Sequence, residues 1–239
     1  MKNYFFIIAL SLSALLLSCH KSAEQTANSE EKTEVAQPST ALQTLRMAYD
    51  LARYGYETES AMALIEAADI LVAVPSVEMD SVVVEKGSVS ATDDKADKAP
   101  ITPAQLLIDA KEFAGDNEHL LALIVDVERK LTASSEVTRG AMPGKDAPIE
   151  HHDRVLAHDT DVYSLHLTEG KLFEAAIIGD GDTDLELYVY DPEGKQVITE
   201  DTYQPIDCYI RFTPAASGIY TLKIVNTGNV YNNYVLLTN

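Results

Sequence analysis

The first half of the chain carries apolar residues at the three-to-four-residue spacing of α-helices. The first stripe comprises Leu42, Leu45, Ala48, Tyr49 and Ala52. In front of it, Thr40 and Gln43 have the spacing of a capping box, and Gly55 behind it supplies a stop signal. A second stripe runs from Met62 to Val72. We therefore predict two helices joined by a turn at Gly55.

The same pattern of two helices then occurs again. Thr102-Pro103-Ala104-Gln105 offers a cap, a proline suited to the first helical turn and a glutamine that reaches back. Apolar stripes over residues 106–113 and 120–131 follow, separated by Gly115. Four helices are therefore expected, arranged as a plain four-helix bundle or as a duplicated hairpin that weakly resembles tetratricopeptide-type units.

Residues 39–133 form a predicted helical-hairpin domain with a long insertion. The insertion, residues 76–100, ends in the polar stretch KGSVSATDDKADKAP. Loops longer than about 15 residues are uncommon inside a compact domain, so we predict a disordered loop, or alternatively a contact segment that orders on binding. Residues 134–150 are expected to be a linker.

From residue 151 onward, apolar and polar residues alternate with period two between turn signals. The expected strands are residues 154–158, 162–168, 172–178, 185–190, 196–199, 208–212, 219–225 and 231–237. Turn chemistry separates them, as in Pro192-Glu193-Gly194 and Ser217-Gly218. The fold class is therefore multidomain, with α-helical hairpins followed by an all-β antiparallel sandwich of jelly-roll-like type.

One stretch of this region carries a family resemblance. The sequence GDGDTDLELYVYDPEG at residues 179–194 is followed by Phe212-Thr213-Pro214, Ser217-Gly218-Ile219-Tyr220 and Tyr234. These motifs resemble the bacterial pre-peptidase C-terminal domain over residues 150–239. The resemblance implies a β-sandwich that serves as a secreted, non-catalytic accessory module.

The amino terminus resembles a bacterial lipoprotein signal. Lys2 precedes an apolar run from Tyr4 to Leu17, and Leu16-Leu17-Ser18-Cys19 has the pattern of a lipobox. We predict a signal peptide at residues 1–18, acylation of Cys19 and a disordered tether at residues 19–38. The alternatives are an ordinary signal peptide or an uncleaved anchor. The expected location is the bacterial cell envelope, on a membrane, in the periplasm or facing the surface.

Composition narrows the function classes. The formal charge of −20 argues against nucleic-acid binding, which needs a concentrated Lys/Arg surface. The chain has only two cysteines, which excludes a disulfide framework. Cys208 alternates with Ile210 and Phe212, so we predict a core position for it.

The acidic loop is the candidate metal site. Asp180, Asp182 and Asp184 alternate with glycines or threonine, and Asp201 or Asp207 from another loop would complete a calcium site of six to eight oxygen ligands. The alternative is a solvated Asp/Gly turn. A transition-metal site at His151, His152, His158 and Asp153 is disfavoured, because adjacent histidines in an extended chain point apart.

Two groups of aromatic residues suit a contact surface. The first comprises Arg46, Tyr49, Arg53, Tyr54 and Tyr56 in or near the first predicted helix, although amphipathic packing explains it equally well. The second comprises Tyr188, Tyr190, Tyr203 and Tyr209, which would contact polysaccharide or protein, with packing in the core or at an edge as the alternative for at least half of them.

The sequence carries neither a G-x-S-x-G nor an H-E-x-x-H motif. We therefore expect a non-catalytic envelope lipoprotein that acts as a binding or adaptor protein, with a membrane and an envelope protein or polysaccharide as partners. The alternatives are an envelope hydrolase or peptidase accessory protein that uses the acidic loop, and a structural spacer.

Overall fold

The computed structural model describes residues 38–79, 84–85, 98–138, 147–202 and 207–239. All of these residues belong to one compact unit. Cys19 and the predicted signal peptide lie outside the described residues, as does all of the predicted tether except Pro38.

The predicted helices are present, two on each side of the long insertion. They are α1 (Thr40–Glu57), α2 (Ala61–Ala73), α3 (Pro103–Ala114) and α4 (Glu118–Thr138). The hydroxyl groups of Ser39, Ser60 and Thr102 cap the first three helices by accepting backbone N–H bonds. The cap of α1 is thus one residue earlier than the predicted Thr40, while Thr102 caps α3 as predicted.

Gly55 has a different role from the one predicted. Helix α1 continues through it to Glu57, and Gly55 is buried. A Cβ atom at Gly55 would lie 2.4 Å from Cδ2 of Leu64, a fully buried side chain of α2. Gly55 therefore permits the close approach of α1 and α2, and it does not stop the helix. Gly115, with φ of 52°, does follow the end of α3 as predicted.

Helix α2 is the centre of the helical part and contacts α1, α3 and α4. Its sequence, AMALIEAADILVA, is apolar over most of its surface, as expected for a helix surrounded by others. The shared core includes Leu64, Ile65, Leu106, Leu107 and Ile124.

Among the described residues, the strands form two five-stranded sheets. Their bounds are β1 (Val77–Glu78), β2 (Val84–Glu85), β3 (Ile149–Val155), β4 (Thr160–Leu167), β5 (Phe173–Gly179), β6 (Leu185–Tyr190), β7 (Val197–Asp201), β8 (Asp207–Phe212), β9 (Gly218–Asn226) and β10 (Asn232–Thr238). One sheet has the order β1-β3-β10-β5-β8 and the other β2-β4-β9-β6-β7. The predicted class of helices followed by an antiparallel β-sandwich is confirmed.

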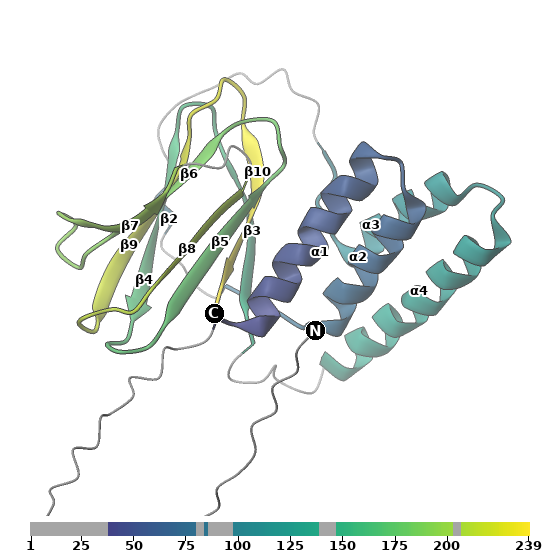
Figure 1. Ribbon diagram of the computed structural model, residues 1–239, viewed down its shortest axis with the longest axis horizontal. Coiled ribbons are helices and arrows are strands. Elements are labelled where there is room, and N and C mark those ends of the chain that lie inside the picture. The colour runs from purple at the N-terminus through teal and green to yellow at the C-terminus, as the bar shows by residue number, and fades with distance from the viewer. Residues whose placement is uncertain (1–37, 80–83, 86–97, 139–146, 203–206) are drawn as a thin grey trace, which may run out of the picture. The chain divides into compact units, whose positions relative to one another are not determined.

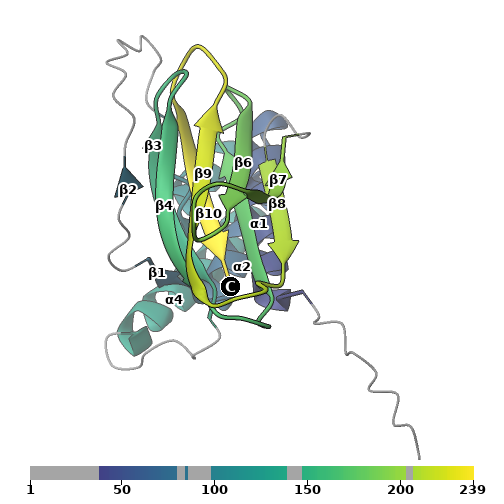
Figure 2. The ribbon, with the colours of Figure 1, turned by 90° about the vertical axis from the view of Figure 1, so that its left-hand side faces the viewer.

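The two short strands differ from the disordered loop expected at residues 76–100. Strand β1 pairs in parallel with β3, and β2 pairs antiparallel with β4. The segment after α2 therefore contributes an edge strand to each sheet (Figure 2). Strand β3 also begins at Ile149, inside the stretch expected to be a linker, because β10 pairs with it from Ile149 to Val155.

Helix α1 covers the outer face of the sheet that contains β5 and β10 (Figure 1). The inward residues of β5, Phe173, Ala175 and Ile177, belong to the core between the two sheets. The outward residues of β5 and β10 pack instead against Leu42, Leu45 and Tyr49 of α1; they are Ala176, Ile178, Val235 and Leu237. The predicted helical and β parts therefore share a buried hydrophobic cluster.

Candidate binding cavity between helix α1 and the β-sandwich

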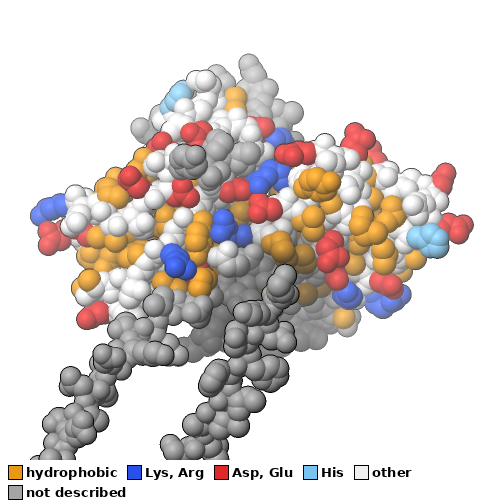
Figure 3. All heavy atoms as spheres, in the orientation of Figure 1, with side chains coloured by type: hydrophobic (Ala, Val, Ile, Leu, Met, Phe, Trp, Pro, Cys, Tyr) orange, Lys and Arg blue, Asp and Glu red, His pale blue; other side chains and the backbone are white. Residues whose placement is uncertain are grey.

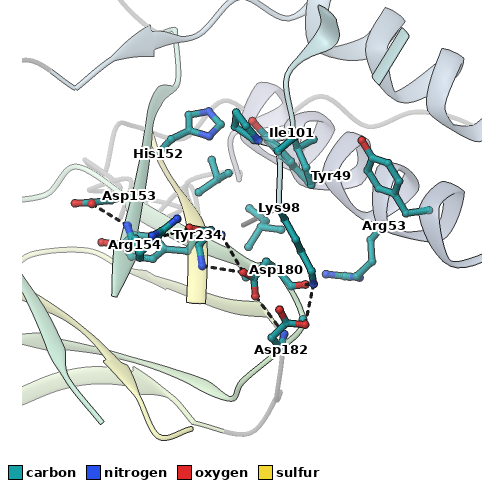
Figure 4. Close-up of a pocket in the computed structure, with 18 of the residues that line it drawn as sticks. Tyr49, Arg53, Lys98, Ile101, His152, Asp153, Arg154, Asp180, Asp182 and Tyr234 are labelled. Carbon is teal, nitrogen blue, oxygen red and sulfur yellow. Dashed lines mark hydrogen bonds and ion pairs between the residues drawn. The ribbon is translucent and has the colours of Figure 1, made fainter. Parts of the chain in front are cut away.

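A cavity of about 850 Å³ lies beside α1, where the helix leaves the sheet. Its walls come from α1, residues 98–101, strands β3 and β10, and the acidic loop at residues 179–182 (Figure 4). Asp109 of α3 completes the lining. The cavity thus combines segments from both halves of the chain.

The floor of the cavity is apolar. Ile178 and Val235, which are 4% and 6% exposed, project from the outer face of the sheet, and Ile101 lies beside them. Tyr49 of α1 is 1% exposed, and burial raises the pKa of its hydroxyl. These side chains form a hydrophobic base on which an apolar ligand group would lose water-exposed surface.

Glu150 of β3 fixes α1 to the sandwich next to the cavity. The hydroxyl of Tyr49 donates to Oε1 of Glu150 at 2.5 Å, and the hydroxyl of Ser76 donates to Oε2 at 2.7 Å. Nε2 of His152 lies 2.7 Å from Oε1. Burial alone would raise the pKa of Glu150, but hydrogen bonds from His152, Tyr49 and Ser76 outweigh it and lower the pKa below its ordinary value.

Arg53 stands on the same face of α1, one helical turn beyond Tyr49. Its guanidinium donates to both carboxylate oxygens of Asp207, at 2.9 and 2.7 Å, and to Asp50 at 2.5 Å. The hydrogen bond with Asp207 is the largest cause of the raised pKa of Arg53. A bidentate pair of this kind holds the guanidinium in one orientation at the cavity wall.

The acidic loop is ordered by hydrogen bonds within the cavity wall. The ammonium of Lys98 donates to Oδ1 of Asp182 at 2.7 Å and to the carbonyl of Asp180 at 3.1 Å. Oδ2 of Asp180 accepts from the backbone and side-chain nitrogens of Asn233 at 3.0 and 3.2 Å. Gly181, with φ of 86°, lets the chain turn between the two aspartates. Figure 4 shows Lys98 reaching across to this loop.

The remaining walls are also tied by polar contacts. The hydroxyl of Tyr56 donates to Asp109 at 2.7 Å, and burial is the largest cause of its raised pKa. Nε of Arg154 donates to Oδ1 of Asn233 at 2.8 Å, and its guanidinium lies 4.0 Å from the ring centroid of Tyr231. These contacts hold the remaining walls of the cavity in place.

The lining has an excess of negative charge. Its carboxylates are Glu57, Asp109, Asp153, Asp180 and Asp182, and its cationic side chains are Arg53, Lys98 and Arg154. Figure 3 shows acidic and basic side chains side by side where α1 meets the sandwich. The cavity therefore favours a ligand group of positive charge.

The five predicted calcium ligands lie in different surroundings. Asp180 and Asp182 line the cavity, whereas Asp207 binds Arg53 and Asp201 accepts from the backbone nitrogen of Tyr209 at 2.9 Å. Oδ1 of Asp184 is buried and has no hydrogen-bond partner among the described residues. In that part of the chain, no three His, Cys, Asp or Glu side chains are grouped to hold a metal ion. Calcium binding stays a prediction, which melting with calcium and with a chelator would test.

The sequence prediction for Cys208 is confirmed. Its side chain is 1% exposed, and its Sγ–H donates to the carbonyl of Leu185. Burial, with a smaller contribution from Asp201, raises the pKa of the thiol to about 12. A thiol in this state is a poor nucleophile at neutral pH.

The tyrosines predicted to form a contact surface lie in different surroundings. Tyr209 is covered by α1, with the guanidinium of Arg46 4.4 Å from its ring centroid, and its hydroxyl donates to Glu174. Tyr190 lies under Lys223 at 4.6 Å, and Tyr188 donates to Glu186. Tyr203 lies outside the described residues. In contrast, the aromatic and guanidinium group of α1 contributes Tyr49, Arg53 and Tyr56 to the cavity.

Sequence reasoning missed Lys98 and Asn233 as cavity residues, and it missed Glu150 as the acceptor that ties α1 to the sandwich beside the cavity. Lys98 stands in a polar stretch that gave no sign of order, and its partner Asp182 is 84 residues away in the chain. Glu150 was assigned to a linker. For Asn233, the available signal was the adjacent pair Asn232-Asn233 before an apolar strand, since amides there suit hydrogen bonds to a neighbouring loop.

The described C-terminal part is thus an antiparallel β-sandwich of two sheets with a cavity beside its outer face. Residues 159–225 match the family model of the bacterial pre-peptidase C-terminal domain, so the resemblance seen in the sequence is confirmed. The match runs from β4 to β9 and so covers the larger part of the sandwich. No match was found among curated proteins.

Solved structures similar to the chain include three bacterial proteins. The pre-peptidase C-terminal domain of collagenase from Bacillus anthracis is 15% identical, with 38% of this chain and 87% of that chain covered and a TM-score of 0.32. The Yersinia pseudotuberculosis-derived mitogen is 17% identical, with coverages of 38% and 84% and a TM-score of 0.33. PliG from Aeromonas hydrophila, a periplasmic inhibitor of g-type lysozyme, is 15% identical, with coverages of 41% and 91% and a TM-score of 0.31. None of the described helices is long and apolar enough to cross a bilayer.

Proposed function

We propose that this protein is a non-catalytic binding lipoprotein of the bacterial envelope, and that its ligand occupies the cavity beside α1. The observation that carries the proposal is the cavity itself, which measures about 850 Å³ and joins an apolar floor to a polar rim. Ligand sites commonly measure about 300–1,000 Å³ and combine these two features. The cavity is therefore large enough for a ligand the size of a few residues or sugars.

The hydrogen bonds that hold the charged side chains of the rim support a role in ligand recognition. Arg53, Lys98 and Asp180 are each held by at least two hydrogen bonds from other parts of the chain. A rim fixed in this way loses little conformational entropy on binding, which favours affinity. The match to a family of domains that accompany peptidases supports an accessory role.

The proposed location follows from the amino terminus. Acylation of Cys19 would anchor the chain on a membrane, and residues 19–38 would hold the folded part away from it as a flexible tether. The protein would then act as an adaptor between the membrane and an envelope protein or polysaccharide. An accessory subunit for an envelope peptidase or hydrolase would use the same cavity, whereas a spacer would not use it.

The binding proposal is tested with residues 20–239 immobilised as bait for detergent-solubilised envelope proteins and for isolated cell-wall polysaccharide. Ala99 is exposed and lines the cavity, so Ala99→Trp fills space in it without disturbing a buried core. Glu193→Gln, on the exposed β6–β7 turn outside the cavity lining, is the matched control. We expect wild type and Glu193→Gln to retain the same material and Ala99→Trp to lose it. Equal retention by all three, or none, would overturn the proposal.

Membrane anchoring gives a separate prediction. In a bacterial host, Cys19→Ser should prevent acylation and move the full-length protein from the membrane fraction to the soluble fraction. Metabolic labelling with an alkyne fatty acid, followed by fractionation, measures both effects. Cys208→Ala is the control and should keep the label, because the Cys208 thiol is buried. Membrane association that persists in Cys19→Ser would contradict the lipoprotein assignment.

A further inference from the structure

The charges of the cavity point to the kind of partner it accepts. Its rim has five carboxylates against three cationic side chains. Arg53 is neutralised by Asp207 and Asp50, and Lys98 is neutralised by Asp182. Arg53 is thus already paired with two carboxylates, and Glu57, which is exposed and also helps to raise the pKa of Arg53, leaves the rim together with Asp109 with more negative than positive charge. A carboxylate has about four acceptor positions, so Asp109 can still accept beside its bonds from Tyr56 and Gln105.

The floor adds a second requirement. Ile178 and Val235 are nearly buried and flank the acidic loop, and Ile101 borders the same space. A ligand that fills the cavity must therefore place an apolar group on this floor while its charged group meets the rim. Within a peptide, a basic residue next to an aliphatic or aromatic residue satisfies both conditions.

Two of the three tyrosines that line the cavity argue against sugar stacking. A sugar ring binds best on an open aromatic face, but the rings of Tyr49 and Tyr234 are 1% and 2% exposed. The hydroxyl of Tyr234 is also turned inward and donates to Asp161 at 2.7 Å. The cavity therefore offers these two rings as edges of a packed wall and gives no stacking surface at either position.

We propose that the cavity binds an extended peptide segment of an envelope protein in which Lys or Arg stands next to an apolar residue. The basic side chain would reach Glu57, Asp109 or the acidic loop, and the apolar side chain would cover Ile178 and Val235. The net charge of −20 would attract such a basic segment and raise its association rate. This inference rests on the proposed function, because it names the partner of the same cavity.

The test uses residues 20–239 of the wild type and a bead library of random decapeptides, sorted by fluorescence and sequenced. We expect the selected peptides to be enriched in Lys or Arg beside Leu, Ile, Val or Phe, and to lose binding to Ala99→Trp. Glu57→Gln and Asp182→Asn should each weaken a selected peptide by about two- to fivefold, and Glu193→Gln should not. Raising the salt concentration should weaken binding in the wild type, since these charges are exposed.

The outcomes separate this inference from the proposed function. Enrichment of acidic or purely apolar peptides would overturn the inference and leave the binding function intact. The same holds if no peptide is enriched while Ala99→Trp still abolishes capture from envelope material. Capture of isolated polysaccharide by the wild type but not by Ala99→Trp would likewise overturn the inference, because the ligand of the cavity would then be a glycan. Loss of all cavity-dependent capture would overturn both.

Discussion

At the scale of single residues, Glu150 connects three segments that are far apart in the chain. Its carboxylate accepts from Tyr49 of α1 and Ser76 after α2, and it lies against His152 of its own strand. Truncating such an acceptor would leave the Tyr49 hydroxyl, which is buried, without its partner, at a cost of about 1–3 kcal/mol. This residue therefore holds one wall of the cavity in place.

The pKa of Glu150 predicts how this junction responds to acid. The pKa is lowered in the folded protein, so the stability that the carboxylate contributes is complete above its unfolded value, about 4.3, and is lost as the pH falls through the folded value. We expect the free energy of unfolding of the wild type to fall more between pH 7 and pH 3 than that of Glu150→Gln. Urea unfolding across this range measures it, and parallel pH profiles would contradict the assignment.

At the scale of elements, the contact of α1 with α2 depends on Gly55. Gly55→Ala would gain about 1 kcal/mol in helix propensity, but its Cβ would overlap the buried Leu64 side chain. Overpacking costs about 1–3 kcal/mol, so we expect a net destabilisation of up to about 2 kcal/mol in urea unfolding. Leu64→Ala removes the overlapping atoms, so adding Gly55→Ala to it should no longer destabilise. If the double-mutant cycle shows no coupling energy between the two substitutions, Gly55 is not needed for the close approach of α1 and α2.

The spacing of apolar residues predicted the longer elements, because the buried side chains of each one recur at the period of a helix or a strand. The helices and the strands from β4 to β10 have enough residues to show a period of 3.6 or 2, whereas the strand predicted at residues 154–158 overlaps β3 only at Arg154 and Val155. The two-residue strands β1 and β2 have no period, and only pairing with β3 and β4 defines them. The stop assigned to Gly55 was wrong because a glycine that permits close packing has the same sequence signal as one that ends a helix.

The candidate site was less predictable than the fold. Sequence analysis selected the acidic loop and the aromatic group of α1 separately. That both line one cavity depends on tertiary contacts such as the one between Arg53 and Asp207, which are 154 residues apart. One signal was present. The apolar runs AAII in β5 and YVLL in β10 lack a polar alternate face, which is typical of strands buried on both sides. That pattern predicts a further layer over this sheet, and α1 supplies it.

At the scale of the whole molecule, the shared cluster makes the sandwich dependent on the helices. Residues 147–239 alone would expose Ile178, Val235 and Leu237, which α1 covers in the full chain. Each such side chain contributes about 1.5–3 kcal/mol when buried. We therefore expect the isolated sandwich to unfold at a lower urea concentration than residues 20–239.

The same exposed face should make the isolated sandwich self-associate, since a contiguous apolar patch favours association in water. Sedimentation velocity at several protein concentrations would measure this, with residues 20–239 expected to remain the less associated form. Replacing Ile178 and Val235 with threonine in residues 147–239 keeps β-branched side chains on the strands and makes the face more polar, so it should reduce self-association. A monomeric isolated sandwich with the unfolding midpoint of residues 20–239 would show that α1 is not needed to stabilise it. In that case the cavity wall formed by α1 would be free to move relative to the sheet, and its rim would not be preorganised for a ligand.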